Sequence, residues 1–202
     1  MKKNKFSKNW IIKQKRDIYV KKSKLEGYRS RAIYKLQEIN DKFKIIKNSI
    51  LVVDLGAAPG SWSQYISRNF NNPKIISIDL KDIEPIKNLV HIKGDFTEEH
   101  HKKNIQNYFG KKVDLIMSDM AVNTTGNKSV DSLVTGELCI EAMNFAVAIL
   151  NKKGGFVSKL FNFSLYSSFV KSPIICVTSS ILSKSKRSIA RTLVCLYFFL
   201  IY

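Results

Sequence analysis

One lysine of this chain stands where a lysine is costly. Lys159 lies near the middle of GGFVSKLF, residues 154–161, which otherwise has the pattern of a short buried strand. Removing an ammonium group from water is expensive, so a lysine in such a strand needs a partner or a function. The alternative is a lysine whose stem covers the sheet edge while its ammonium group reaches solvent.

A stretch of small residues indicates a ligand site elsewhere in the chain. GAAPG, residues 56–60, ends the apolar run that starts at 50 and precedes a predicted helix at 61–70. Small residues let a ligand approach the backbone, and the free N–H groups of a helix start favour an anionic group. Neither the G-x-G-x-x-G pattern nor the P-loop pattern fits. The loop therefore predicts a site for an adenosine-type ligand with an anionic group; the alternative is a tight turn that merely needs glycine.

Three acids stand at the ends of later predicted strands. They are Asp79 in SIDL, Asp95 in KGDF and Asp119 in MSDM. Ligands of open α/β sheets bind outside the carboxyl ends of the strands, where an acid after the second strand binds a ribose diol. Asp95 is then placed to reach the base edge, and Asp119 to face the reactive end of the ligand. Any one of them is as easily a helix cap or a turn residue, but together they converge on one cleft.

Strands and helices alternate along the first three quarters of the chain. Apolar runs predict five strands, at 50–56, 74–80, 89–96, 113–120 and 154–161. Helices are predicted within 29–43, 61–70, 98–110 and 130–150. This alternation predicts an α/β fold with a doubly wound, mostly parallel sheet. From about residue 163 the pattern is lost, although 172–182 and 192–202 are candidates for closing strands.

The charge of the chain is large and unevenly placed. Its 202 residues include 34 Lys and Arg against 16 Asp and Glu, a net charge of +18. Residues 1–50 hold 16 basic and four acidic residues, 51–162 hold 13 and 12, and 163–202 hold five and none. Basic ends around a neutral middle point first to nucleic acid and second to an anionic membrane. The alternative is a general lysine richness of the organism's proteins, but this would also have given residues 51–162 an excess of positive charge.

The three cysteines, Cys139, Cys176 and Cys195, have no metal-ligand spacing. Their odd number, and an N-terminus without an apolar signal segment, predict a reducing, cytoplasmic location. The apolar run at 193–202 is too short to span a bilayer. We therefore expect no membrane partner.

Several motifs occur in this order at family-like separations: GYRSRAIYKL, VVDLGAAPGSWSQY, IDL, GDF, DLIMSDMAVNTTG and GGFVSKLF. On these motifs the chain resembles the FtsJ family of S-adenosylmethionine-dependent ribosomal RNA 2′-O-methyltransferases, over about residues 9–162. The resemblance implies a Rossmann-like class I methyltransferase fold and S-adenosyl-L-methionine as cofactor. It implies a uridine of the large-subunit (23S) rRNA as substrate, methylated on its ribose 2′-OH within the assembled subunit.

The resemblance also implies roles for single residues. The family's cofactor contacts match Gly60, Trp62, Asp79, Asp95 and Asp119. Three members of its Lys-Asp-Lys-Glu catalytic tetrad match Lys35, Asp119 and Lys159. No metal is implied, and His91, His100 and His101 are interpreted as surface residues. The alternative for Trp62 is a core position.

These residue types suit methyl transfer to a ribose hydroxyl. The sulfonium methyl is already activated, so the enzyme must align the attack and accept one proton. A lysine is a base only when burial and a second ammonium group lower its pKa. On this hypothesis Lys159 accepts the proton, Lys35 lies close by, and Asp119 holds Lys159 in place.

The basic N-terminal arm, with Arg29 and Arg31, fits phosphate contacts that position RNA without reading its sequence. The alternative for the two arginines is to stabilise the helix that carries Lys35. The expected organisation is an arm at 1–28, a methyltransferase domain at 29–162 and a divergent segment at 163–202. A monomer is expected.

The chain departs from the family pattern in two places. Val122 stands where family members usually have proline, and no Asp or Glu follows Glu141, so the tetrad's glutamate is absent. The C-terminal strands are therefore predicted to be divergent or incomplete, and a reading-frame change near Asn162 is one hypothesis. An RNA-binding pseudoenzyme or ribosome assembly factor is accordingly the alternative to an active methyltransferase.

Overall fold

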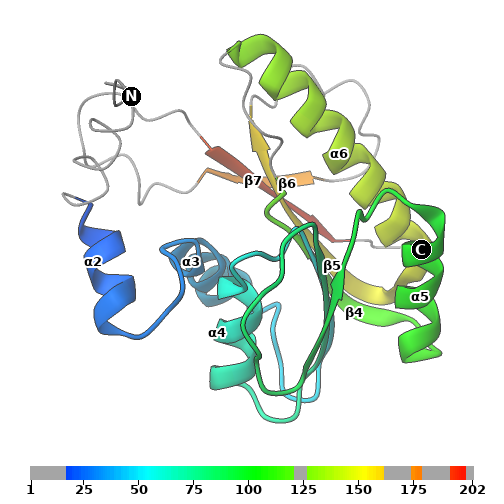
Figure 1. Ribbon diagram of the computed structural model, residues 1–202, viewed down its shortest axis with the longest axis horizontal. Helices are drawn as coiled ribbons and strands as arrows, with labels where there is room; N and C mark the ends of the chain where they lie inside the picture. The colour runs from blue at the N-terminus through cyan, green and yellow to red at the C-terminus, as the bar shows by residue number, and fades with distance from the viewer. Residues whose placement is uncertain (1–16, 121–126, 162–173, 179–191, 199–202) are drawn as a thin grey trace, which may run out of the picture.

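The five strands predicted from the apolar runs are present. The computed structural model describes residues 17–120, 127–161, 174–178 and 192–198 (Figure 1). The strands are β1 (Leu51–Leu55), β2 (Lys74–Asp79), β3 (Leu89–Lys93), β4 (Val113–Ser118) and β5 (Leu150–Phe161). β5 begins earlier than the predicted start at residue 154. Its pairing with β4 shifts in register between Val113 and Leu115.

These strands form one sheet in the order β3-β2-β1-β4-β5-β7-β6. The first five are parallel neighbours, and β7 (Thr192–Phe198) runs antiparallel to β5 and to β6 (Ile174–Thr178). The order reverses between β1 and β4, which is the switch point where ligands of such sheets bind. The prediction of a doubly wound, mostly parallel, Rossmann-like sheet is confirmed. Within the two candidate closing segments, the described residues 174–178 and 192–198 form β6 and β7, which extend this sheet.

Helices cover both faces of the sheet (Figure 1). One face is covered by α3 (Ile33–Phe43) and α4 (Ser61–Asn69), and the other by α5 (Glu99–Phe109) and α6 (Lys128–Ile149), while α2 (Ile18–Leu25) packs on α3 through Tyr19 and Tyr34. Alternate residues of β1 point to opposite faces, so Val53 packs in one core with α5 and α6, and Val52 in the other with α3 and α4. A strand buried on both faces explains why ILVVDLG is continuously apolar.

Part of the basic arm is helical. Asp17 caps α2, because its Oδ1 accepts a hydrogen bond from the backbone N–H of Tyr19 at 2.9 Å. Residues 1–16 of the arm lie outside the described part of the chain. Among the described helices, none is long and apolar enough to cross a membrane.

The core around β5 is tightly packed, and Phe156 tests its contribution to stability. Its side chain is fully buried between β4 and the α5–α6 layer. We expect Phe156→Ala to lower the free energy of unfolding by about 3–5 kcal/mol, measured by urea denaturation. Val147→Ala, on the exposed side of α6, is the control and should change it by less than about 0.5 kcal/mol. Equal effects of the two substitutions would contradict this packing.

Candidate active site

An ion pair lies where β4 ends beside β5. Ser118 of β4 is in register with Ser158 of β5, so the next residues, Asp119 and Lys159, are neighbours at the carboxyl edge. The Nζ atom of Lys159 lies 2.8 Å from Oδ1 of Asp119 and donates a hydrogen bond to the Asp119 backbone carbonyl at 2.9 Å. The side chain of Lys159 is only 10% exposed. The partner that a buried lysine requires is therefore Asp119.

A second lysine reaches the same carboxylate from α3. The Nζ atom of Lys35 lies 3.9 Å from Oδ1 of Asp119. Burial lowers the pKa of Lys35, and the positive charges of Lys159 and Arg31 lower it further, while Asp119 opposes them. The structure thus brings together the three predicted catalytic residues, which come from α3, β4 and β5.

Hydrogen bonds between residues 27–32 and 59–64, here called the seam, hold α3 against the start of α4. The indole Nε1 of Trp62 donates to the carbonyl of Ala32 at 2.8 Å, and the Ser61 hydroxyl contacts the Ser30 hydroxyl at 2.8 Å. Trp62 is 3% exposed, which agrees with the alternative that it is a core residue. A cofactor contact by this residue stays a prediction, and only its backbone N–H, in the first turn of α4, is placed to make one.

Two glycines shape the loop after β1. Gly56 has a φ of 69° and lies against Met120, where a Cβ atom would stand 2.3 Å from the Met120 Cγ. Gly60 has a φ of 91° and caps α4. Both values lie in the left-handed region that favours glycine. The loop therefore passes close to the Asp119 end of β4 and presents the N-terminus of α4 at the carboxyl edge of the sheet.

The acids after β2 and β3 also take part in local turns. Asp79 accepts the Lys81 N–H at 2.9 Å through Oδ1 and the Ala58 N–H at 2.9 Å through Oδ2, so its carboxylate also lies against the glycine loop. Asp95 accepts both the N–H and the hydroxyl of Thr97 at 2.8 Å through one oxygen, Oδ1. These contacts agree with the alternative that both acids are turn residues. Their binding to a cofactor stays a prediction.

Sequence reasoning missed a fourth carboxyl group at this edge. Asp54 of β1 is 1% exposed, and the hydroxyl of Ser63 donates to its Oδ2 at 2.6 Å. Burial raises the pKa of Asp54; hydrogen bonds from Ser63 oppose this and the charges of Asp119 and Asp79 add to it, so that the pKa is raised to about 7. The available signal was an acid inside the otherwise apolar run ILVVDLG.

Both arginines of the RSRA motif have protein partners. Arg31 pairs with Asp17 and so links the segment before α3 to the start of α2. Arg29 donates to backbone carbonyls of the loops after β1 and β2. These contacts favour the structural alternative over phosphate contacts.

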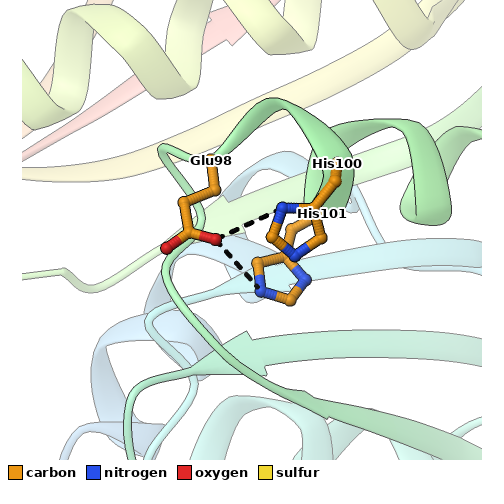
Figure 2. A group of neighbouring side chains, drawn as sticks. All are labelled: Glu98, His100 and His101. Carbon is orange, nitrogen blue, oxygen red and sulfur yellow. Dashed lines mark ion pairs between the residues drawn. The ribbon is translucent and has the colours of Figure 1, made fainter.

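The histidines contact residues outside the Lys35–Asp119–Lys159 group. His91 contacts the Ser77 hydroxyl and the Lys81 carbonyl. Figure 2 shows His100 and His101 beside Glu98, with nitrogens 3.3 and 3.8 Å from its Oε2. These three residues are a possible metal-binding group. They lie in the first turn of α5, whose N–H groups favour anions, and we assign no metal to the reaction.

The donors at the carboxyl edge fit S-adenosylmethionine. Asp79 lies where a ribose diol is bound, the N–H groups of the first turn of α4 suit a carboxylate, and Asp119 lies between them and the buried lysines. A separate cavity of about 450 Å³ is lined by Leu51, Lys74, Leu89 and Tyr108. It opens at the amino ends of the strands and contains no predicted site residue.

Comparisons with known proteins agree with this geometry. The sequence model of the FtsJ-like methyltransferase family matches residues 28–197. The chain belongs to this family.

Curated relatives of this FtsJ-like chain cover most of it. A protein of Pelagibacter ubique named ribosomal RNA large subunit methyltransferase E is 58% identical over 170 residues, 84% of each chain. A Rickettsia akari protein of the same name is 47% identical over 161 residues, 77% of this chain and 71% of its own. A Plasmodium falciparum crystal structure, described as a ribosomal RNA methyltransferase, has a TM-score of 0.70 and 29% identity, and covers 87% of this chain and all of its own.

The FtsJ-like match extends past residue 162, where the sequence motifs end, into β7. The proposed divisions at residues 28 and 162 stay predictions. Val122 lies outside the described residues. The β7 residue paired with Lys159 is Val194, so this pairing supplies no acid for the family's tetrad.

The buried Asp54 predicts a pH-dependent stability. Its pKa is raised above that of an unfolded carboxyl, so its contribution is present at low pH and is lost as the pH rises from about 4 through about 7. Asp54→Asn keeps an acceptor for Ser63 but does not titrate. We expect the stability loss between pH 5 and pH 8 to shrink by about 1.4 kcal/mol or more in this variant.

Urea denaturation of both proteins at the two pH values measures this difference. Asp82→Asn, which removes an exposed carboxylate from the loop after β2, is the control and should keep the wild-type dependence. An unchanged pH dependence in Asp54→Asn would show that the carboxyl group is ionised at both pH values.

Proposed function

We propose that this chain transfers the methyl group of S-adenosylmethionine to the ribose 2′-OH of a uridine in 23S rRNA, within the assembled large subunit. The observation that carries the proposal is the Lys35–Asp119–Lys159 group at the carboxyl edge of β4 and β5. The names of the curated relatives support large-subunit rRNA as the substrate. We further propose that the protein acts as a monomer in the cytoplasm.

The cofactor supplies a methyl group on a positively charged sulfur, which is already activated for transfer. The remaining task is to align the 2′-oxygen and accept its proton. Asp119 fixes the Lys159 amine through its carboxylate and its backbone carbonyl, at 2.8 and 2.9 Å. We assign proton acceptance to Lys159 and place Lys35 as the neighbouring cation that favours a neutral amine.

Exposed positive charge supports an RNA substrate. Lys21, Lys22 and Lys24 are all exposed on α2, in the same N-terminal region as α3. Lysines at such positions neutralise phosphates and position RNA without reading its sequence. The arm is thus suited to present RNA to the side of the sheet where Lys35 lies.

Methyl transfer to undermethylated large subunits tests the proposal. Lys159→Ala should reduce transfer from labelled S-adenosylmethionine about 10²- to 10⁴-fold, the range for loss of a general base. Lys153→Ala, which removes an exposed lysine from the same strand, is the matched control and should keep full transfer. Binding of RNA and cofactor by the wild-type chain without transfer would support the pseudoenzyme alternative.

The pH dependence of transfer tests the role of Lys35. A nearby positive charge favours the neutral form of a proton-accepting amine, so Lys35→Ala should move the rise of the rate to higher pH. The rate should be measured between pH 6 and 10 with saturating cofactor. If the rate of Lys35→Ala no longer rises with pH, Lys35 itself is the proton acceptor, and burial does lower its pKa. An unchanged pH profile would refute a role for Lys35 either as the neighbouring cation or as the proton acceptor.

A further inference from the structure

The guanidinium group of Arg29 joins two loops of the carboxyl edge. Nη1 donates to the carbonyl of Pro59 at 3.0 Å, in the glycine loop after β1. Nη2 donates to the carbonyls of Glu84 and Pro85 at 2.9 and 3.2 Å, in the loop after β2. Three charge-assisted hydrogen bonds to main-chain oxygens define where these loops stand relative to each other.

Gly60 makes room for this arrangement. A Cβ atom at Gly60 would lie 2.9 Å from Nη1 of Arg29 and 3.1 Å from Cδ1 of Ile86. The guanidinium group and the loop after β2 therefore both approach the backbone at the N-cap of α4. This is the place where the N–H groups of α4 are presented to a ligand.

The backbone of Arg29 is fixed as well. Its N–H donates to Oε1 of Gln64 at 3.1 Å, and the amide of Gln64 donates to the Gly27 carbonyl at 3.1 Å. Gln64 is 8% exposed. The backbone of Arg29 is thus held to α4 through Gln64, and its guanidinium group to the loops after β1 and β2.

We propose that Arg29 is a positioning residue for the cofactor, which sets the spacing of the Gly60 loop and the loop after Asp79, and that it is not an RNA contact. The inference rests on the proposed cofactor site at this edge. A planar guanidinium fork can satisfy three carbonyls in two directions, whereas an ammonium group offers one point of charge.

Cofactor binding without RNA tests the inference directly. Isothermal titration with S-adenosylhomocysteine should give a dissociation constant about tenfold or more higher for Arg29→Ala, equivalent to the loss of one charge-assisted hydrogen bond. Arg29→Lys should bind nearly as weakly. Lys103→Ala, which removes one positive charge from the exposed side of α5, is the control and should bind within twofold of wild type.

The salt dependence of RNA binding separates positioning from phosphate contact. Loss of a phosphate-binding arginine lowers the slope of log affinity against log salt by about one. We expect Arg29→Ala to keep the wild-type slope. In the transfer assay it should raise KM for S-adenosylmethionine and keep kcat at saturating cofactor.

Two results would overturn the inference: wild-type cofactor affinity in Arg29→Ala, or a slope reduced by one. Thermal melting without ligand checks that the variants are folded, and Arg29→Lys serves if the alanine variant is not. Cofactor binding by the wild-type chain without methyl transfer would refute the proposed function and leave the Arg29 result standing.

Discussion

The geometry of the active site depends on the seam between residues 27–32 and 59–64. Within it, Trp62 holds Ala32, Ser61 contacts Ser30, and Gln64 binds the backbone of Gly27 and Arg29. The seam places Lys35 beside the β4–β5 edge, and Arg29 extends it to the loop after β2. A segment that precedes the sheet thus holds both the proposed cofactor side and the proposed proton-accepting side in place.

Charge compensation is the second constraint on this edge. Asp54, Asp79 and Asp119 converge there, and their mutual repulsion adds to the burial that raises the pKa of Asp54. Lys35 and Lys159 both lie against Asp119; burial lowers the pKa of Lys35, and the charge of Lys159 lowers it further. Each of these buried ionisable groups is therefore either in an ion pair or has a pKa shifted towards its uncharged form, as the cost of desolvation requires.

Periodic and positional signals allowed much of this arrangement to be predicted from the sequence. Parallel strands end at one edge, so the acids at or just after the ends of β2, β3 and β4 (Asp79, Asp95 and Asp119) were expected at the same edge of the sheet once the strands were recognised, with Asp95 separated from Asp119 by β2 and β1. The roles of Trp62, Arg29 and Asp54 depend on hydrogen bonds between segments about 10 to 55 residues apart, which no local pattern encodes. The early start of β5 was missed because Asn151, Lys152 and Lys153 interrupt its apolar pattern.

The missing glutamate changes the charge of the lysine group more than its geometry. All 16 acids of the chain lie at or before Glu141, and Asp119 is the acid that raises the pKa of Lys35. A second carboxylate beside the lysines would favour their charged forms and oppose proton acceptance. With two lysines and one aspartate, the group has a net positive charge that favours a neutral amine and attracts the phosphates beside the ribose. In the proposed mechanism, the absence of this glutamate therefore does not remove the ability of the group to accept a proton.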